Sequence, residues 1–295
     1  MSSVDTGTGA GGADATGQRG AGVAETAVAT GNTPTAVRTG PSWILRDSWT
    51  EATRHLRAVP RNPELLVFAT IQPVMFVLLF VYVFGGAIAT PGYTNYEQYL
   101  IPGIVAQTVV FGSAFTGVGI AEDLSKGIID RLRSLPMYQP AVLIGRTLSD
   151  LARNVLAFAV MMVVAWLVGF RVEGSWLAAL GATALLLGFS YAFSWIQAYI
   201  GLSVRSVEAA NSAGFIWMFP LTFVSSAFVL TATMPGWLAT IADANPFTKL
   251  TNAARALFNR QDPGSDLWQA VAWAVGITVV FAFLAGRKFS RSTSR

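Results

Sequence analysis

Long runs of apolar residues recur six times along this chain. Each run has about the length of 20 residues that an α-helix needs to cross the hydrocarbon core of a bilayer. Only 12% of the 295 residues are charged, whereas soluble domains have roughly 25%. The sequence therefore predicts an all-α integral membrane protein with six transmembrane helices, at residues 65–85, 99–120, 148–170, 176–201, 212–231 and 267–286.

The segments outside these runs differ in composition. The first forty residues are rich in Gly, Ala and Thr and lack aromatic side chains, so they bury too little apolar surface to offset the entropy of folding. Four segments are therefore predicted: a disordered cytoplasmic tail at 1–40, an amphipathic helix at 41–63, a six-span domain at 64–286 and a basic cytoplasmic tail at 287–295.

The segment 41–63 has a helical apolar stripe. Leu45, Trp49 and Leu56 fall on one face, and charged residues occupy the other. Such a helix just before a membrane span is typical of one that lies in the bilayer interface. Packing against a soluble partner is the alternative.

The distribution of Lys and Arg predicts the orientation. With six spans, both chain ends lie on one side of the membrane. If Arg153 is assigned to that side, the opposite loops hold only four of the twenty basic residues, namely Arg171, Lys249, Arg255 and Arg260. Because cytoplasmic loops carry the excess of positive charge, both termini are predicted to be cytoplasmic.

The third span carries charge near its start. Asp150, Arg153 and Asn154 lie in its first turns, and charges at mid-bilayer are costly. These residues are therefore expected near the water boundary. Asp150 and Arg153 are three residues apart, a spacing that lets them pair on a helix.

A charged segment follows the second span. Its apolar residues recur at helical spacing, at Leu124, Ile128, Leu132 and Leu135. Glu122 and Asp130 are each four residues from Lys126, and Pro136 stops the helix. A short helix with an apolar ridge and charged flanks suits docking in a groove of another protein. A solvated cytoplasmic loop is the alternative.

The loop between spans 5 and 6 contains two apolar helical pieces that are too short to cross a membrane. They meet at Asn245-Pro246 and end at Asp262-Pro263-Gly264. We expect an extracytoplasmic re-entrant hairpin that dips into the outer leaflet.

Motifs for chemistry are missing. The dipeptide Gly-Lys does not occur, which excludes a phosphate-binding P-loop. There is no GxSxG or HExxH motif and no cysteine. The sequence therefore predicts no catalytic residue, no metal site and no nucleic-acid partner.

Ionisable residues are scarce within the spans, although four amides are candidates for lining a translocation path, namely Gln72, Gln107, Gln197 and Asn211.

Several stretches together carry a family resemblance. They are "RNPELLVFATIQPVMFVLLFVYVFGG", "YLIPGIVAQ", "GIAEDLSKGIIDRLRSLPM", "GRTLSDLARN" and "SSAFVLTATMPGWLATIADANPFTKLTNAARAL". From about residue 42 onward the chain resembles ABC-2-type export permeases, and among them the daunorubicin and doxorubicin resistance permeases of actinobacteria. One departure is Leu230, where members often have proline.

This resemblance implies partners and roles. It implies a second permease copy, as a homodimer or related heterodimer, and two copies of a separate ABC ATP-binding subunit that holds the ATP and Mg. No cofactor is expected in this chain. The helix at 41–63 would be the elbow helix. The ATPase-coupling helix would comprise Glu122, Asp123, Lys126, Gly127, Asp130, Arg131, Leu132, Arg133, Leu135 and Pro136.

The resemblance also implies a function. The chain would be a permease in a bacterial inner or cell membrane that exports a hydrophobic or amphiphilic compound, such as a drug or antibiotic, by alternating access. Only the assembled complex would hydrolyse ATP. Export of a lipid, glycolipid or lipid-linked polysaccharide is the alternative, and an ion-coupled transporter or channel is an alternative of another class.

Overall fold

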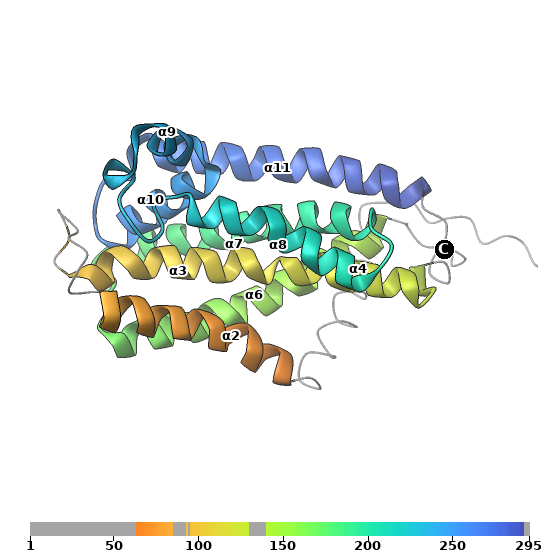
Figure 1. Ribbon diagram of the computed structural model, residues 1–295, viewed down its shortest axis with the longest axis horizontal. Helices are drawn as coiled ribbons and strands as arrows, with labels where there is room; N and C mark the ends of the chain where they lie inside the picture. Colours follow the sequence, from red (N-terminus) through yellow and green to blue (C-terminus); the bar gives the residue numbers. More distant parts are fainter. Residues whose placement is uncertain (1–62, 85–92, 94, 130–139, 292–295) are drawn as a thin grey trace, which may run out of the picture. The chain divides into compact units, whose positions relative to one another are not determined.

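The structure, a computed structural model, describes residues 63–84, 93, 95–129 and 140–291 (Figure 1). These residues form helices and connecting turns, with no strand among them, which confirms the all-α class. The elements are α2 (Pro63–Leu78), the π-helical turn η2 (Leu79–Phe84), α3 (Tyr96–Gly112), α4 (Ala114–Ser125), α6 (Pro140–Val168), α7 (Trp176–Gly201), α8 (Val207–Phe223), η3 (Thr231–Thr233), α9 (Gly236–Ala244), α10 (Pro246–Phe258) and α11 (Gly264–Arg291). The predicted tail at 1–40 and nearly all of the predicted helix at 41–63 lie outside the described residues.

Four helical stretches are long and apolar enough to cross a membrane. They have mean hydropathies between 1.6 and 2.1, and they are Tyr96–Ser125, Val142–Val168, Trp176–Gly201 and Gly264–Ser290. The first combines α3 and α4. The apolar part of the first predicted span is shorter, at Ile71–Val83, and α8 has 17 residues. The count of six spans therefore stays a prediction.

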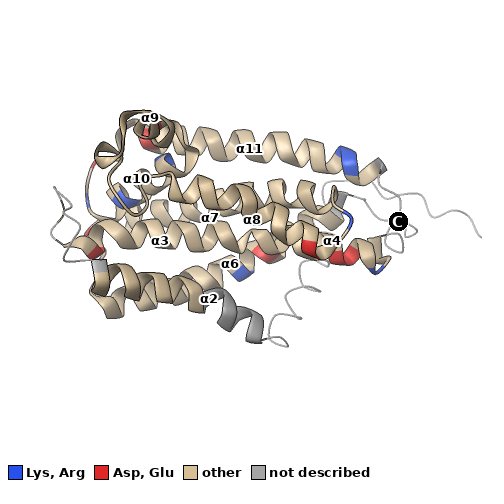
Figure 2. Cartoon of the chain, viewed as in Figure 1, with Lys and Arg blue, Asp and Glu red and all other residues tan. Residues whose placement is uncertain are grey.

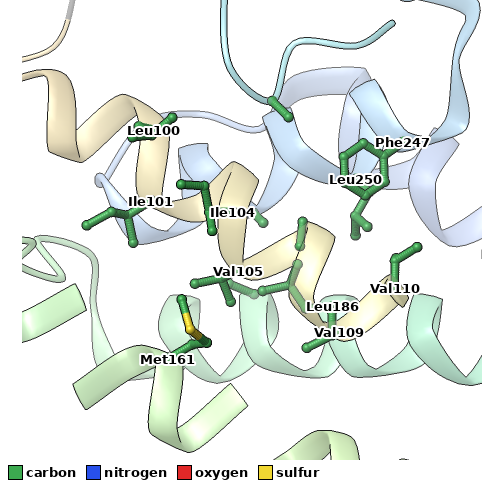
Figure 3. Packing of buried hydrophobic residues seen from close by; sticks show 14 of the residues in the cluster. Leu100, Ile101, Ile104, Val105, Val109, Val110, Met161, Leu186, Phe247 and Leu250 are labelled. Carbon is green, nitrogen blue, oxygen red and sulfur yellow. The ribbon is translucent and has the colours of Figure 1, made fainter. Parts of the chain in front are cut away.

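Helix α3 is the centre of the bundle. In the α3–α4 stretch 78% of the most apolar window is buried, whereas in α11 only 6% is buried. Figure 3 shows residues of α3 packed against α6, α7 and α10, including Val105, Met161, Leu186 and Phe247. The outward faces of α6 and α11 are apolar and exposed, as expected of helices that face lipid.

The directions of the helices follow from their contacts. In α6, Asn154 lies at Gly112 of α3, whereas Arg146 lies at Gly119 of α4, so α6 runs antiparallel to α3 and α4. The C-terminal part of α11 packs against the C-terminal part of α7, because Ala285 and Phe289 share a buried cluster with Ala198 and Leu202. Helices α7 and α11 therefore run in the same direction.

Three helix ends differ from the predicted bounds. The third span was expected to start at residue 148, but α6 begins at Pro140, where a proline fits because first-turn amides have no helical partner. The fifth span was expected to extend to residue 231, but α8 ends at Phe223. Also, α11 continues to Arg291, into the predicted tail at 287–295.

The chain after α8 is irregular because side chains of the next helices replace its helical hydrogen bonds. The Asn245 amide donates to the carbonyls of Leu221 and Val224, at 2.7 and 2.6 Å. The backbone amide of Ser226 donates to the Thr248 hydroxyl, at 3.2 Å. Irregular backbone at membrane depth is tolerated only when its polar groups are paired in this way.

Candidate functional site

The inner end of the bundle is the end at which α4 and α7 finish and α6 begins. Helix α4 ends at Ser125, and Gly127 has a φ of +67°, the left-handed conformation that commonly ends helices. The helix predicted between Glu122 and the stop at Pro136 is therefore interrupted near its start, at Gly127. Asp130, Arg131, Leu132, Arg133, Leu135 and Pro136 lie outside the described residues.

The apolar ridge predicted in this segment begins inside the chain. Leu124 and Ile128 are partly buried and pack against the cluster that contains Trp195, Leu202 and Phe289. The first half of the ridge thus anchors the segment to the bundle.

Glu122 and Lys126 form the predicted pair four residues apart, with 2.5 Å between Lys126 Nζ and Glu122 Oε1. The hydrogen bond to Glu122 and the charge of its carboxylate raise the pKa of Lys126. Both side chains are exposed, so this ion pair lies on the surface.

A partly buried cluster of four charged residues joins α4 to α6, whose charged positions are coloured in Figure 2. We call it the inner charge network, and it consists of Asp123 of α4 with Arg146, Asp150 and Arg153 of α6. Arg153 Nη2 is 3.0 Å from Asp150 Oδ1, which confirms the predicted pair. Arg146 lies 3.4 Å from Asp150 and 3.5 Å from Asp123. The charges of the network sum to zero, so each buried ion has a compensating partner.

Neutral groups of α4 and α7 extend this network. The Thr116 hydroxyl donates to Asp150 Oδ2 at 2.6 Å. The amide of Asn154 donates to the Ser190 hydroxyl at 2.6 Å, and this hydroxyl donates to the Val109 carbonyl at 2.7 Å. Helices α3, α4, α6 and α7 are thus tied together by polar contacts.

The outer end of the bundle carries a different arrangement. Arg255 of α10 is only 2% exposed. Its guanidinium donates to the carbonyls of Tyr99 and Ser226, at 2.7 and 2.8 Å, and lies 3.8 Å from the Tyr99 ring centre. No carboxylate pairs with it among the described residues. The neighbouring ion pair joins Lys249 to Asp266 across 3.0 Å.

A row of phenylalanines runs along one flank of the bundle. We call it the phenylalanine ridge, and it consists of Phe76 of α2, Phe80 of η2, Phe111 of α3, Phe215, Phe219 and Phe223 of α8, and Phe228. Neighbouring ring centres are 4.9–6.5 Å apart, the separation typical of interacting aromatic rings. Phe219 and Phe223 are 40% and 42% exposed. These two rings are thus the accessible part of the ridge, whereas Phe228 is buried.

Three of the four amides predicted to line a translocation path lie one helical turn before a residue of the phenylalanine ridge. Gln72 lies four residues before Phe76, Gln107 four before Phe111, and Asn211 four before Phe215, and this spacing places each pair on one helix face. Gln72 and Asn211 are exposed, whereas Gln107 is buried.

The fourth amide, Gln197, is fully buried between α4, α7 and α8. Its nitrogen lies 2.9 Å from Met218 Sδ, and a side chain at Gly214 would overlap its amide group. Gln197 therefore packs inside the bundle, separate from the ridge.

Comparison with known proteins assigns the chain to a family. The family model of the ABC-2 type transporter matches residues 47–259. The chain belongs to the ABC-2 type transporter family. It is 35% identical to the daunorubicin resistance ABC transporter permease protein DrrB1 of Streptomyces coeruleorubidus over 264 residues, which cover 90% of this chain and 91% of the relative.

Two more distant relatives of this ABC-2 permease have similar descriptions. It is 21% identical to the probable doxorubicin resistance ABC transporter permease protein DrrC of Mycobacterium tuberculosis, over 79% of this chain and 84% of the relative. It is 24% identical to the putative transport permease ycf38 of Porphyra purpurea, over 68% and 70%. The family is that of a membrane subunit that lacks its own ATPase site and works with an ABC ATPase partner.

Sequence reasoning found only part of these sites in the ABC-2 permease. It paired Asp150 with Arg153 but missed their link to α4 through Asp123, Thr116 and Arg146. The signal was present, because residues 116 and 123 share one face of a helix and residues 146 and 150 share one face of another. The ridge also had a signal, the four-residue spacing of Phe215, Phe219 and Phe223.

Proposed function

We propose that this ABC-2 permease exports a hydrophobic or amphiphilic compound and is driven by a separate ATPase subunit. The observation that carries the proposal is the likeness over nine tenths of both chains to a permease named for daunorubicin resistance. The phenylalanine ridge supports it, because flat apolar rings suit the binding of aromatic or amphiphilic cargo.

The positions of the helix ends support six spans. Helices α7 and α11 run in the same direction, so Gly201 and Gly264 belong to opposite ends of the bundle. The chain between them must return across the membrane, and α8 is the helix that makes this return. Its 17 residues extend about 26 Å, and the irregular segment that follows completes the crossing of a core about 30 Å thick. By the same argument, α2 with η2 brings the chain to the start of α3.

The basic residues support an inner end in the cytoplasm. Among the described residues, seven Lys and Arg lie toward the inner end and four toward the outer end, and this excess marks the inner end as cytoplasmic. The seven are Lys126, Arg146, Arg153, Arg205, Arg287, Lys288 and Arg291, and the four are Arg171, Lys249, Arg255 and Arg260. Helices α9 and α10 then form the extracytoplasmic hairpin. Trp237 and Ile241 of α9 are exposed, at 70% and 55%, and suit contact with the outer leaflet.

Phe219 and Phe223 of the ridge are exposed on a flank of the chain, so one copy does not enclose it. In this proposal a second permease copy covers the ridge, and the path for the cargo lies between the two copies. Two ATPase subunits then bind ATP and Mg and dock at the segment that follows α4, where the coupling residues are predicted.

Reconstitution tests the proposal. The chain and its ATPase subunit are placed in liposomes, and ATP-dependent movement of daunorubicin is compared with that of a fluorescent phospholipid. Movement of daunorubicin supports drug export, whereas movement of only the phospholipid supports the lipid alternative. Transport by the chain alone without ATP would contradict the proposal and favour a channel or an ion-coupled transporter.

A matched pair of variants tests the ridge in the same liposomes. Phe219→Ala is expected to lower daunorubicin transport by about tenfold, since a stacked aromatic contact contributes roughly 0.5–1.5 kcal/mol beyond the area that it buries. Phe283→Ala removes a 65% exposed ring from the outer face of α11 and should leave transport unchanged. Equal effects of both variants would contradict a role for the ridge.

A further inference from the structure

The contact between α4 and α6 has a fixed register. Residues 112, 116, 119 and 123 share one face of α3 and α4, and residues 146, 150 and 154 share one face of α6. Because the helices are antiparallel, Gly112 meets Asn154, Thr116 meets Asp150, and Gly119 and Asp123 meet Arg146. A side chain at Gly112 or Gly119 would overlap Asn154 or Arg146. Charge-assisted hydrogen bonds and the close packing at Gly112 and Gly119 thus set one alignment of the two helices.

The second span tightens directly beside this contact. Ser113, between α3 and α4, keeps helical dihedral angles of −67° and −21°, and its amide donates to the Val110 carbonyl, three residues back. Two carbonyls in the last turn of α3 are bonded by α6, since Arg153 donates to Gly112 at 3.3 Å and Asn154 donates to Val109 at 3.4 Å. Helix α4 therefore continues α3 within one span, and α6 stabilises their junction.

The contact of α4 with α7 has a different character. The backbones of Gly117 and Gly201 meet so closely that a Cβ on either would overlap the other helix. Small residues allow this close approach by shape, without charged bonds that fix a register. Helix α4 also packs against α8. Among the described residues, α6 is the neighbour to which α4 is bound by directional side-chain contacts.

We propose that the inner charge network makes α6 follow α4 when α4 moves. The inference rests on the proposed function, in which the ATPase subunit displaces the segment after α4. Arg146 and Asp150 are then positioning residues, because they touch neither ATP nor cargo but convert a displacement of α4 into one of α6. Slippage between the two helices would leave buried charges unpaired, which is strongly unfavourable.

The test measures how much cargo is moved per ATP hydrolysed in the reconstituted complex. The probe is daunorubicin, or the fluorescent phospholipid if the native complex moves only that. Asp150→Asn should lower this ratio by about tenfold while ATP hydrolysis and binding of the ATPase subunit persist. Lys249→Gln is the control, since it removes a more exposed ion pair, between α10 and α11, that lies outside the inner charge network. It should leave the ratio unchanged.

A charge-balanced double variant separates coupling from stability. Asp150→Asn with Arg153→Gln removes one charge of each sign, and such neutral replacements are often tolerated by the fold. We expect this variant to assemble and still to show a lowered ratio. A native ratio in either assembled variant, or a double variant that cannot assemble, would overturn the inference by making the network a fold element only. An inactive native complex would instead overturn the proposed function.

Discussion

The two ends of this permease both bury arginine, yet they compensate its charge differently. At the inner end, Arg146 and Arg153 face the carboxylates of Asp123 and Asp150 across two regular helices. At the outer end, Arg255 donates to backbone carbonyls and stacks on Tyr99. The inner arginines therefore fix the relation between two helices, whereas the outer arginine supplies hydrogen bonds that a broken backbone lacks.

This difference follows from the local backbone. Helices α4 and α6 satisfy their own amides and carbonyls, so their side chains are available for one another. The segment after α8 has left its helix, and its carbonyls need donors from elsewhere. Besides Arg255, the hydroxyls of Tyr99 and Tyr96 supply such donors, to Ser226 at 2.8 Å and to Phe228 at 3.3 Å. The outer end should therefore be the more sensitive to side-chain truncation.

The largest effect is expected for Arg255→Ala. The change removes the hydrogen bonds from the guanidinium to the carbonyls of Tyr99 and Ser226 and leaves the Tyr99 hydroxyl as the remaining side-chain donor to Ser226. Each hydrogen bond to a charged group contributes about 1.5–3 kcal/mol, and two of them reach the lower end of the stability of a typical domain, about 5–15 kcal/mol. Much less folded permease should therefore remain in the membrane. Membrane abundance and monodispersity in detergent measure this loss.

Arg260→Asn is the control for this truncation. Arg260 is exposed and has a φ of +55°, a conformation that asparagine tolerates. Its abundance should match that of the native chain. An Arg255→Ala variant as abundant and as stable as Arg260→Asn would remove the contrast between the two ends.

A smaller effect is expected for Asn245→Asp. The oxygen of Asn245 caps α10 by accepting from the Phe247 amide at 2.8 Å, and a carboxylate can keep this bond. The two donations to Leu221 and Val224 are lost, at about 1–3 kcal/mol. The midpoint of thermal unfolding in detergent should fall. An unchanged midpoint would mean that only the cap of α10 matters.

The smallest effect is expected for Lys249→Gln. The Lys249–Asp266 pair is partly exposed, with 19% and 23% of the side chains accessible. Such pairs contribute at most about 1 kcal/mol, so the unfolding midpoint should shift only slightly. A loss as large as that of Asn245→Asp would show that ion pairs also hold the outer end.

Much of the fold followed from the sequence because lipid permits only a few patterns. Apolar length placed α7 at its observed bounds, and Asn245-Pro246 marked the start of α10. The end of α8 did not follow from apolar length. Its residues 224–230 are as apolar as a helix would be, and the chain can unwind there because donors from other segments, Asn245 and Arg255 as well as the hydroxyls of Tyr96 and Tyr99, bond its carbonyls.

The sites were less predictable than the fold. Local pairs such as Glu122–Lys126 and Asp150–Arg153 need only helical spacing, and both were found. The link of Arg146 to Asp123 joins residues from two helices. It requires the antiparallel register that the close packing at Gly112 and Gly119 sets. The phenylalanine ridge draws on four separate segments, so no single window of sequence contains it.

The most direct test of the account is the accessibility of the two ends. The chain has no cysteine, so single substitutions give a clean signal with a membrane-impermeant thiol reagent. Ser265→Cys, at the exposed start of α11, should react in intact cells, and Ser125→Cys, at the exposed end of α4, should react only after the membrane is opened. Labelling of Ser125→Cys in intact cells, with protection of Ser265→Cys, would contradict a cytoplasmic inner end and the coupling route built on it.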